Sequence, residues 1–240
     1  AVDLSGNYSG TSSNVTFGKP GYLTSNTDGT ITSTVAANVE AGFSIVKYTG
    51  STPNQTIGHG LGKIPELIIV KNLDVSGNGW ATQSPYSGGA DYHMMLNSTQ
   101  AAQNNVDWIW NDTEPTSTVF TVGQNSITNG NGENHISYCF VSIPGYSKIG
   151  SYTSTYPNTT SVYVGFQPRF VMIKSYNQTR NWVIHDSARG ADEQLYANLS
   201  NAEGNTGTDF QFTSTGFNVS GGGNDLDGGP SYSYIFLAIA

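Results

Sequence analysis

The stretch Leu67-Ile68-Ile69-Val70-Lys71 decides the fold, because it returns about a hundred residues later as Phe170-Val171-Met172-Ile173-Lys174. Both stretches are short apolar runs rich in β-branched residues, which is the pattern of a strand buried on both faces. A proline stands two residues before each run, at Pro65 and Pro168. The chain therefore contains a strand-forming unit that occurs twice.

Further echoes keep the same order along the chain. They are Gly42-Phe43-Ser44 with Gly145-Tyr146-Ser147, Tyr48-Thr49 with Tyr152-Thr153, Trp80 with Trp182, and Ser137-Tyr138-Cys139-Phe140 with Ser233-Tyr234-Ile235-Phe236. We predict that the two units superpose with Trp80 over Trp182 and Phe140 over Phe236, and that both phenylalanines lie in a core.

The pattern predicts an all-β chain of two tandem, homologous β-sandwich-like units, at residues 41–143 and 144–240. Residues 1–40 are predicted to be a short N-terminal β segment, either a linker or the end of an upstream module. Clusters of Gly, Asn, Pro and Ser separate the apolar runs, and no stretch has the period of a long amphipathic helix. The closing run at residues 232–239 is apolar on both faces, which predicts a central strand.

The composition is typical of extracellular and virion-surface β-proteins. Of the 240 residues, 36% are hydrophobic and only 11% are charged, so solubility comes from uncharged polar side chains. A net charge of −8 disfavours nucleic-acid binding and attraction to an anionic membrane. The apolar runs are about five to seven residues long, too short to insert in a bilayer. The single Cys139 cannot form an internal disulfide and is predicted to be a small core residue.

No motif with the spacing of a metal site is present, and we predict no cofactor. The four histidines, His59, His93, His135 and His185, are scattered along the chain. Asp225 and Asp227 form a fragment of a calcium loop that lacks the further ligands of an EF-hand. The alternative reading is a polar turn.

Two sets of residues resemble catalytic groups without their geometry. His185-Asp186-Ser187 are neighbours, and adjacent strand residues point to opposite faces, so we interpret them as a strand end entering a turn. Paired carboxylates are what a glycosidase needs. Candidates are Asp107, Asp112, Glu114, Asp186, Asp192 and Glu193. All lie in polar loops, where solvated charges are the simpler interpretation.

The aromatic residues carry the candidate binding site. Trp80 and Trp182 recur at equivalent positions, which favours a core role for both. Trp108-Ile109-Trp110 has no counterpart in the second unit, and strand alternation places both tryptophans on one face. If exposed, Trp108 and Trp110 would stack on sugar rings or anchor a partner. Burial of both is the alternative.

Several dispersed pieces resemble a domain of unknown function that occurs in virion proteins of tailed phages, especially those of marine bacteria and cyanobacteria. The pieces are residues 41–50, 57–62, 65, 67–72, 116–120, 138–140, 182–184 and 186–189. The similarity covers residues 30–240. It implies a component of a tail fibre, spike or capsid fibre, and it supplies no catalytic residues to carry over.

The resulting expectation is a non-enzymatic structural protein at the virion surface. Its expected partners are other copies of the chain, other virion proteins and host-surface glycan. Analogy with phage fibres favours a trimer. Two alternatives stay open: a tail-spike enzyme that degrades glycan, and a secreted cellular adhesin or extracellular filament subunit.

Overall fold

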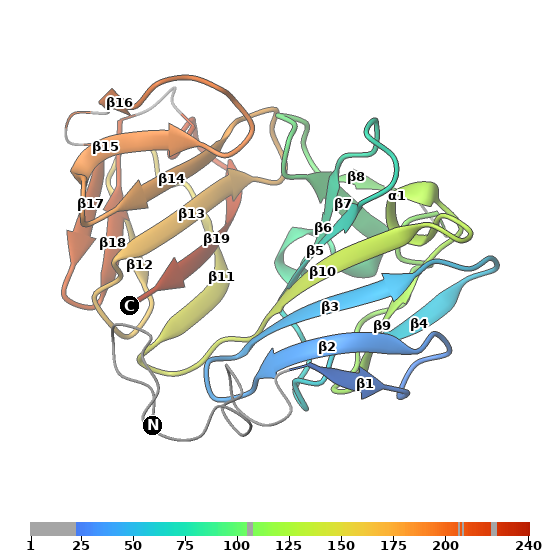
Figure 1. Cartoon of the computed structure of the whole chain (residues 1–240). Coiled ribbons are helices and arrows are strands. Elements are labelled where there is room, and N and C mark those ends of the chain that lie inside the picture. The colour runs from blue at the N-terminus through green and yellow to red at the C-terminus, as the bar shows by residue number, and fades with distance from the viewer. Residues whose placement is uncertain (1–22, 105–107, 206, 208, 222–224) are drawn as a thin grey trace.

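A computed structural model describes residues 23–104, 108–205, 207, 209–221 and 225–240. Antiparallel sheets dominate this part of the chain, which confirms the predicted all-β sandwich fold (Figure 1). Its helical elements are one α-helical turn and two 3-10 helices. We keep the names first unit and second unit for residues 41–143 and 144–240.

The N-terminal segment and the first unit contain these elements: β1 (Thr24–Asn26), β2 (Ser33–Asn38), β3 (Phe43–Thr49), β4 (Gln55–Gly58), β5 (Leu67–Asn72), β6 (Trp80–Gln83), η2 (Pro85–Ser87), η3 (Gly89–Asp91), β7 (Tyr92–Met95), β8 (Gln103–Asn104), β9 (Val119–Val122), α1 (Ser126–Asn129) and β10 (Asn134–Phe140).

The second unit contains β11 (Ser147–Thr153), β12 (Thr160–Tyr163), β13 (Phe170–Ser175), β14 (Trp182–Asp186), β15 (Gly190–Tyr196), β16 (Gly204–Asn205), β17 (Phe210–Thr213), β18 (Gly216–Val219) and β19 (Ser233–Ile239).

The order of strands recurs between the units. The large sheet of the first unit runs β3-β10-β5-β6-β7-β8, and that of the second unit runs β11-β19-β13-β14-β15-β16. A small sheet covers one face of each: β4-β9 in the first unit and β12-β18-β17 in the second. The predicted central position of the closing run is correct, because β19 lies between β11 and β13.

Each large sheet is apolar on both faces because each face meets a different core. In β19, Tyr234 and Phe236 point toward the small sheet of their own unit, whereas Ile235 and Leu237 point toward the other unit. Alternation along a strand makes this division possible. Cys139 lies in the first unit's core at 0% exposure, and burial raises its pKa to about 12.

The third core joins the two large sheets, which stand side by side in Figure 1. Its buried members are Leu67, Ile69 and Met94 from the first unit and Ile149, Met172, Trp182, Ile235 and Leu237 from the second. We call this set the inter-unit core. The two units therefore pack against each other through a shared core and are not independent domains joined by a linker.

Hydrogen bonds cross the same boundary. Trp182 Nε1 donates to the Met95 carbonyl at 3.0 Å, and Ala102 N donates to the Tyr176 carbonyl at 2.7 Å. Lys174 is fully buried, and its Nζ donates to the Thr99 carbonyl at 3.2 Å. Burial lowers the pKa of Lys174 to about 8.

Strand registers give the residue equivalences. Lys71 pairs with Trp80 and Lys174 pairs with Trp182, so the predicted match of the two tryptophans is correct. Phe140 pairs with Leu67, and Ile239 pairs with the counterpart of Leu67, Phe170.

Phe140 therefore corresponds to Ile239, and Phe236 corresponds to Ser137. The predicted match of Phe140 with Phe236 is wrong by three residues, because the short Ser-Tyr echo is offset from the pairing. Phe236 lies in the second unit's core, whereas Phe140 is half-buried against the inter-unit core.

The N-terminal segment does not stand apart from the first unit. Of residues 1–40, the structure describes those from 23 onward, and they include β1 and β2. These strands extend the large sheet in the order β1-β2-β3, with Val35 opposite Val46. The described part of this segment thus packs on the first unit.

Candidate functional site

The two tryptophans predicted to share a face do not share one. Trp108 is 64% exposed, whereas Trp110 is 2% exposed and belongs to the first unit's core. Residues 108–110 form a turn instead of a strand, so strand alternation does not apply to them. Gly123 N donates to the Ile109 carbonyl at 2.8 Å and fixes this turn against the core. Trp108 alone remains as an exposed aromatic side chain.

The two aspartates of the predicted calcium fragment bind different partners. The Asp225 carboxylate accepts from Asn181 N and from Asn181 Nδ2, both at 3.0 Å. Asp227 is fully buried. Burial raises the pKa of Asp227, and interactions with the side chains of Ser154 and Thr160 only partly offset the rise. Both carboxylates thus support loops of the second unit.

Asp227 has a counterpart in the first unit that sequence reasoning missed. Tyr48 donates its hydroxyl to the Thr128 carbonyl at 2.6 Å, and Tyr152 donates to the Leu226 carbonyl at 2.7 Å. The residue after each acceptor is Asn129 or Asp227.

Asn129 holds the connection between β3 and β4, as Asp227 holds that between β11 and β12. Its Oδ1 accepts from Ser51 N at 2.9 Å, and its Nδ2 donates to the carbonyls of Pro53 and Gly123. The pair is a repeated structural anchor, and the recurring tyrosines are the sequence signal that leads to it.

In the described part of the chain, no three His, Cys, Asp or Glu side chains gather as a metal site.

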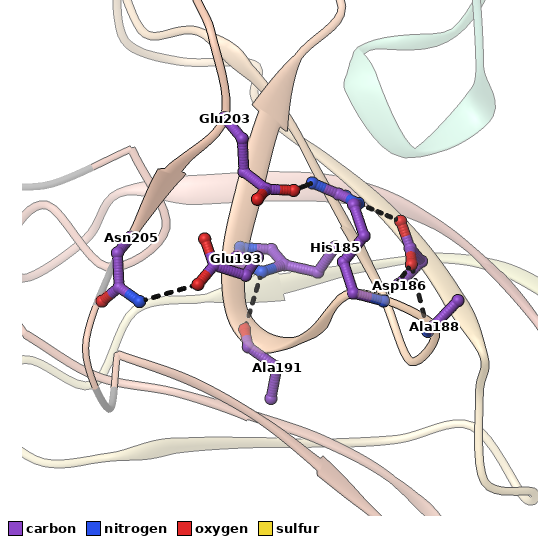
Figure 2. A network of polar contacts seen from close by, with 8 residues as sticks. His185, Asp186, Ala188, Ala191, Glu193, Glu203 and Asn205 are labelled. Atoms are coloured by element: carbon purple, nitrogen blue, oxygen red, sulfur yellow. Dashed lines mark hydrogen bonds and ion pairs between the residues drawn. The ribbon is translucent and has the colours of Figure 1, made fainter.

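His185 and Asp186 point to different partners, as the turn interpretation predicts (Figure 2). The ring of His185 stacks on Phe210 at 4.1 Å between centroids, and its Nδ1 lies 3.0 Å from the Ala191 carbonyl. Asp186 accepts from Ala188 N at 3.1 Å and from Arg189 Nε at 2.7 Å. Asp186 therefore stabilises the turn between β14 and β15.

The histidines serve as buried neutral groups. Burial lowers the pKa of His59, His93 and His135, and it lowers that of His185 to about 4. His135 stacks on Tyr48 at 5.1 Å, at the place where Tyr234 stacks on Tyr152 at 4.8 Å in the second unit. These rings fill core positions.

Glu114 and Glu193 have local hydrogen-bond partners, and Asp192 and Glu193 lie in β15 rather than in the polar loop predicted for them. Glu114 accepts from Ala90 N at 2.8 Å and from Gln83 Nε2 at 3.2 Å. Glu193 accepts from Asn205 Nδ2 at 3.0 Å (Figure 2). Asp107 lies outside the described residues. Asp112 sits in a turn with a φ of 43°.

Three hollows in the surface lie along β11. The first, of about 320 Å³, is lined by Tyr86, Lys148, Gly150, Ser151, Tyr152, Ser161, Val162, Tyr163 and Phe236. The second, of about 360 Å³, shares Lys148 and Tyr163 with the first. Tyr163 is 76% exposed beside both. We call this stretch, bounded by β11 and β12, the open flank.

The third hollow, of about 380 Å³, lies where the two units meet. Most of its lining is apolar, and it includes Phe43, Phe140, Ile149, Leu237 and Ile239. The open flank and this groove are the concave surfaces on which a partner molecule would find both apolar contact and main-chain groups.

The chain was compared with protein families, curated proteins and solved structures. A sequence model of DUF7483, described as a domain of unknown function, matches residues 7–240. The match therefore begins within the segment predicted to be a linker. No curated protein and no solved structure matches the chain. None of the helices in the described residues has the length and apolar composition needed to cross a membrane.

Proposed function

The chain belongs to the DUF7483 family, and we propose that it is a non-enzymatic structural protein of a virion surface, in a tail fibre or capsid fibre. The observation that carries this proposal is the inter-unit core. Two sandwiches that share a core form a stiff block, and stiffness is what a fibre or knob requires from its building units.

The use of charged groups supports the same proposal. Asp186, Glu114 and Asp225 each accept hydrogen bonds from nearby main-chain amides. His185 is held against Phe210 with a pKa of about 4. Such groups rigidify turns and cores instead of facing a substrate.

The placement on a virion rests on the resemblance to domains of phage virion proteins and on the low charge of the chain. Only 11% of its residues are charged. Mass spectrometry of purified phage particles tests this placement. We expect the chain to co-purify with infectious particles at a constant ratio, whereas recovery only from the cell envelope would favour the alternative of a cellular adhesin or filament subunit.

Partners are proposed on the same basis: further copies of the chain in a homo-oligomer, preferably a trimer, and neighbouring virion proteins. Light scattering on the purified full chain measures this state directly. A strict monomer at high concentration contradicts the proposal.

Contact with host-surface glycan is proposed for Trp108, because exposed aromatic rings stack on sugars. We expect a Trp108→Ala variant to lose glycan binding and a Trp110→Phe variant to keep it, because Trp110 is buried. Equal binding by wild type and Trp108→Ala rules this contact out.

The alternative of a glycan-degrading enzyme has its own test. Incubation with host polysaccharide, followed by analysis of chain length, would reveal cleavage. Cleavage that Asp112→Asn or Asp186→Asn abolishes, in variants that still fold, would replace the structural proposal.

A further inference from the structure

The two units differ in how one side of the sandwich is closed. In the first unit, residues 24–38 lie along the edges of both sheets. β2 pairs with β3 of the large sheet, with Val35 opposite Val46 and Thr34 opposite Lys47. Val35 is 1% exposed and belongs to the first unit's core.

The same segment also bonds to β4 of the small sheet. Ile31 N donates to the Thr56 carbonyl at 3.2 Å, and Ser33 Oγ donates to the Gly58 carbonyl at 2.8 Å. The approach is so close that a Cβ on Gly58 would lie 1.6 Å from the Asn26 side-chain oxygen. Glycine at position 58 therefore makes room for the covering segment.

The second unit has no such cover among the described residues. There β11 pairs only with β19, and β12 pairs only with β18. In the small sheets, Gly58 pairs with Val119 and Tyr163 pairs with Gly216. Val119 and Gly216 occupy equivalent positions, so Tyr163 is the counterpart of Gly58. Tyr163, which is 76% exposed, thus lies at the position that the covering segment occupies in the first unit.

The outer side of β11 presents main-chain groups of the kind that β3 uses to hold β2. Ile149 N donates outward to Ser142 Oγ at 3.0 Å, and Ser154 N donates inward to the Tyr232 carbonyl at 2.8 Å. Alternation then directs the amides of Ser151 and Thr153 outward. In the described part of the chain, neither has a main-chain partner on that side.

The edge is longer than the other ends of the two large sheets, and beyond Lys148 it lacks the usual protection. Native sheets blunt their edges with charges, prolines or very short strands. The other ends of the two large sheets follow this rule, since β1 has 3 residues and β8 and β16 have 2 each. β11 has 7 residues, and its stretch from Ile149 to Thr153 carries no charge and no proline.

The hollow at the open flank corresponds to the place of a covering side chain. Val35 lies opposite Val46 in the first unit, and the counterpart of Val46 is Gly150. Gly150 lines the hollow of about 320 Å³ together with Tyr152 and Val162. Lys148 is the only charged side chain among the residues that line this hollow and its neighbour, which disfavours a basic occupant.

We propose that the open flank binds an extended, uncharged strand of a partner polypeptide by β-strand addition, with a small β-branched side chain inserted beside Gly150. Main-chain hydrogen bonds to Ser151 and Thr153 hold the strand, and the hollow selects the inserted side chain. The required chemistry is that of residues 30–39, which cover the equivalent edge of the first unit and contain no charge. The inference does not depend on the placement in a virion.

A labelled synthetic peptide with the sequence of residues 30–39 tests the proposal on the full chain. We expect saturable binding in fluorescence anisotropy and a loss of at least about tenfold in affinity for Ser151→Pro, which removes an outward amide. Ser151→Ala is the matched control, because it keeps the amide, and its affinity should stay within about twofold. Absence of saturable binding, or equal binding by both variants, overturns the proposal.

Disulfide trapping gives a second reading that does not depend on how the proline variant folds. Thr34 lies opposite Lys47, whose counterpart is Ser151. A Ser151→Cys chain should therefore exchange faster with a mixed-disulfide peptide carrying cysteine at position 34 than with one carrying it at position 33, which points to the other face. Equal rates contradict the register. Self-association of the full chain that Ser151→Pro abolishes would make a second copy the occupant and overturn the assignment to a separate partner.

Discussion

The first and second units have the same strand order, but one edge of the large sheet is covered in the first unit and uncovered in the second. In the first, β3 is covered by β2, whereas in the second the equivalent β11 is the last strand of its sheet among the described residues. A duplicated fold thus carries one unit whose sheet is extended by added chain and one whose sheet ends at an uncovered strand. The comparison separates what the fold requires, which recurs, from what each unit adds to it.

Core contacts show the recurring part. Tyr48 meets Phe120 edge to face at 6.2 Å, and Tyr152 meets Phe217 in the same way at 6.1 Å. A local difference lies beside them. A Cβ on Gly150 would lie 2.8 Å from the Phe236 ring, so this ring takes the space that the Val46 side chain has in the first unit.

The largest expected effect is a difference in the stability lost when each of the two equivalent tryptophans is truncated. Trp182 is fully buried in the inter-unit core, whereas Trp80 is half-buried against it. We expect Trp182→Ala to lower the free energy of unfolding by about 4–5 kcal/mol, and Trp80→Ala by about half of that. Chemical denaturation measures both losses. Similar losses for the two variants would mean that the units contribute equally to the inter-unit core.

The corrected register predicts that Phe236 and Phe140 contribute unequally to the free energy of unfolding. Phe236 is 4% exposed in the second unit's core, and Phe140 is half-buried. Phe236→Ala should cost about 3–4 kcal/mol and Phe140→Ala about 1–2 kcal/mol. Equal costs in the same denaturation experiment would restore the equivalence that the Ser-Tyr echo suggested.

Acid should act through the buried histidines. His185 has a pKa of about 4, below the ordinary value of 6.5, so the unfolded chain binds its proton first as the pH falls. The stability from this group is therefore complete above pH 6.5 and is lost between about pH 6.5 and 4, to a total of roughly 3 kcal/mol.

The first unit supplies the matched variant for this pH experiment. The counterpart of His185 is Gln83, also buried, so His185→Gln replaces a titrating group by the residue of the other unit. The variant should flatten the curve of unfolding free energy against pH in this window. An unchanged slope would show that His185 does not remain neutral in the fold.

The smallest expected effect concerns cations. Asp225 accepts two hydrogen bonds from Asn181, and Asp227 is fully buried beside Ser154 and Thr160, so calcium would have to displace existing contacts. We expect calcium or EDTA to move the melting temperature by less than about 1 °C. A fall with EDTA that calcium reverses would assign a cation to this loop.

The fold class was predictable because apolar runs are local signals. The run at residues 232–239 is apolar at every position that meets a core, and this pattern alone predicts a central strand. β4 gives no such signal, because Gln55 and Thr56 are polar and form no apolar run. The sequence also does not show which positions of β10 and β19 correspond. Long-range strand pairing sets this correspondence, and the short Ser-Tyr echo does not.

The candidate site was less accessible to sequence reasoning. The shared face of Trp108 and Trp110 assumed a strand where the chain forms a turn. Asn129 is one of many asparagines in a polar chain, and only its own hydrogen bonds and the one that Thr128 accepts single it out. The open flank is visible only by comparison of edges, because it is defined by a covering strand that the second unit lacks among the described residues.

Amide hydrogen exchange of β3 and β11, resolved by residue, tests the central claim most directly. The account predicts slow exchange at Lys47, which lies opposite Thr34, and fast exchange at its counterpart Ser151, whose amide faces outward. The inward amides of both strands should exchange slowly and serve as internal controls. Equal protection of Lys47 and Ser151 in the isolated full chain would contradict the account, because β11 would then already be covered.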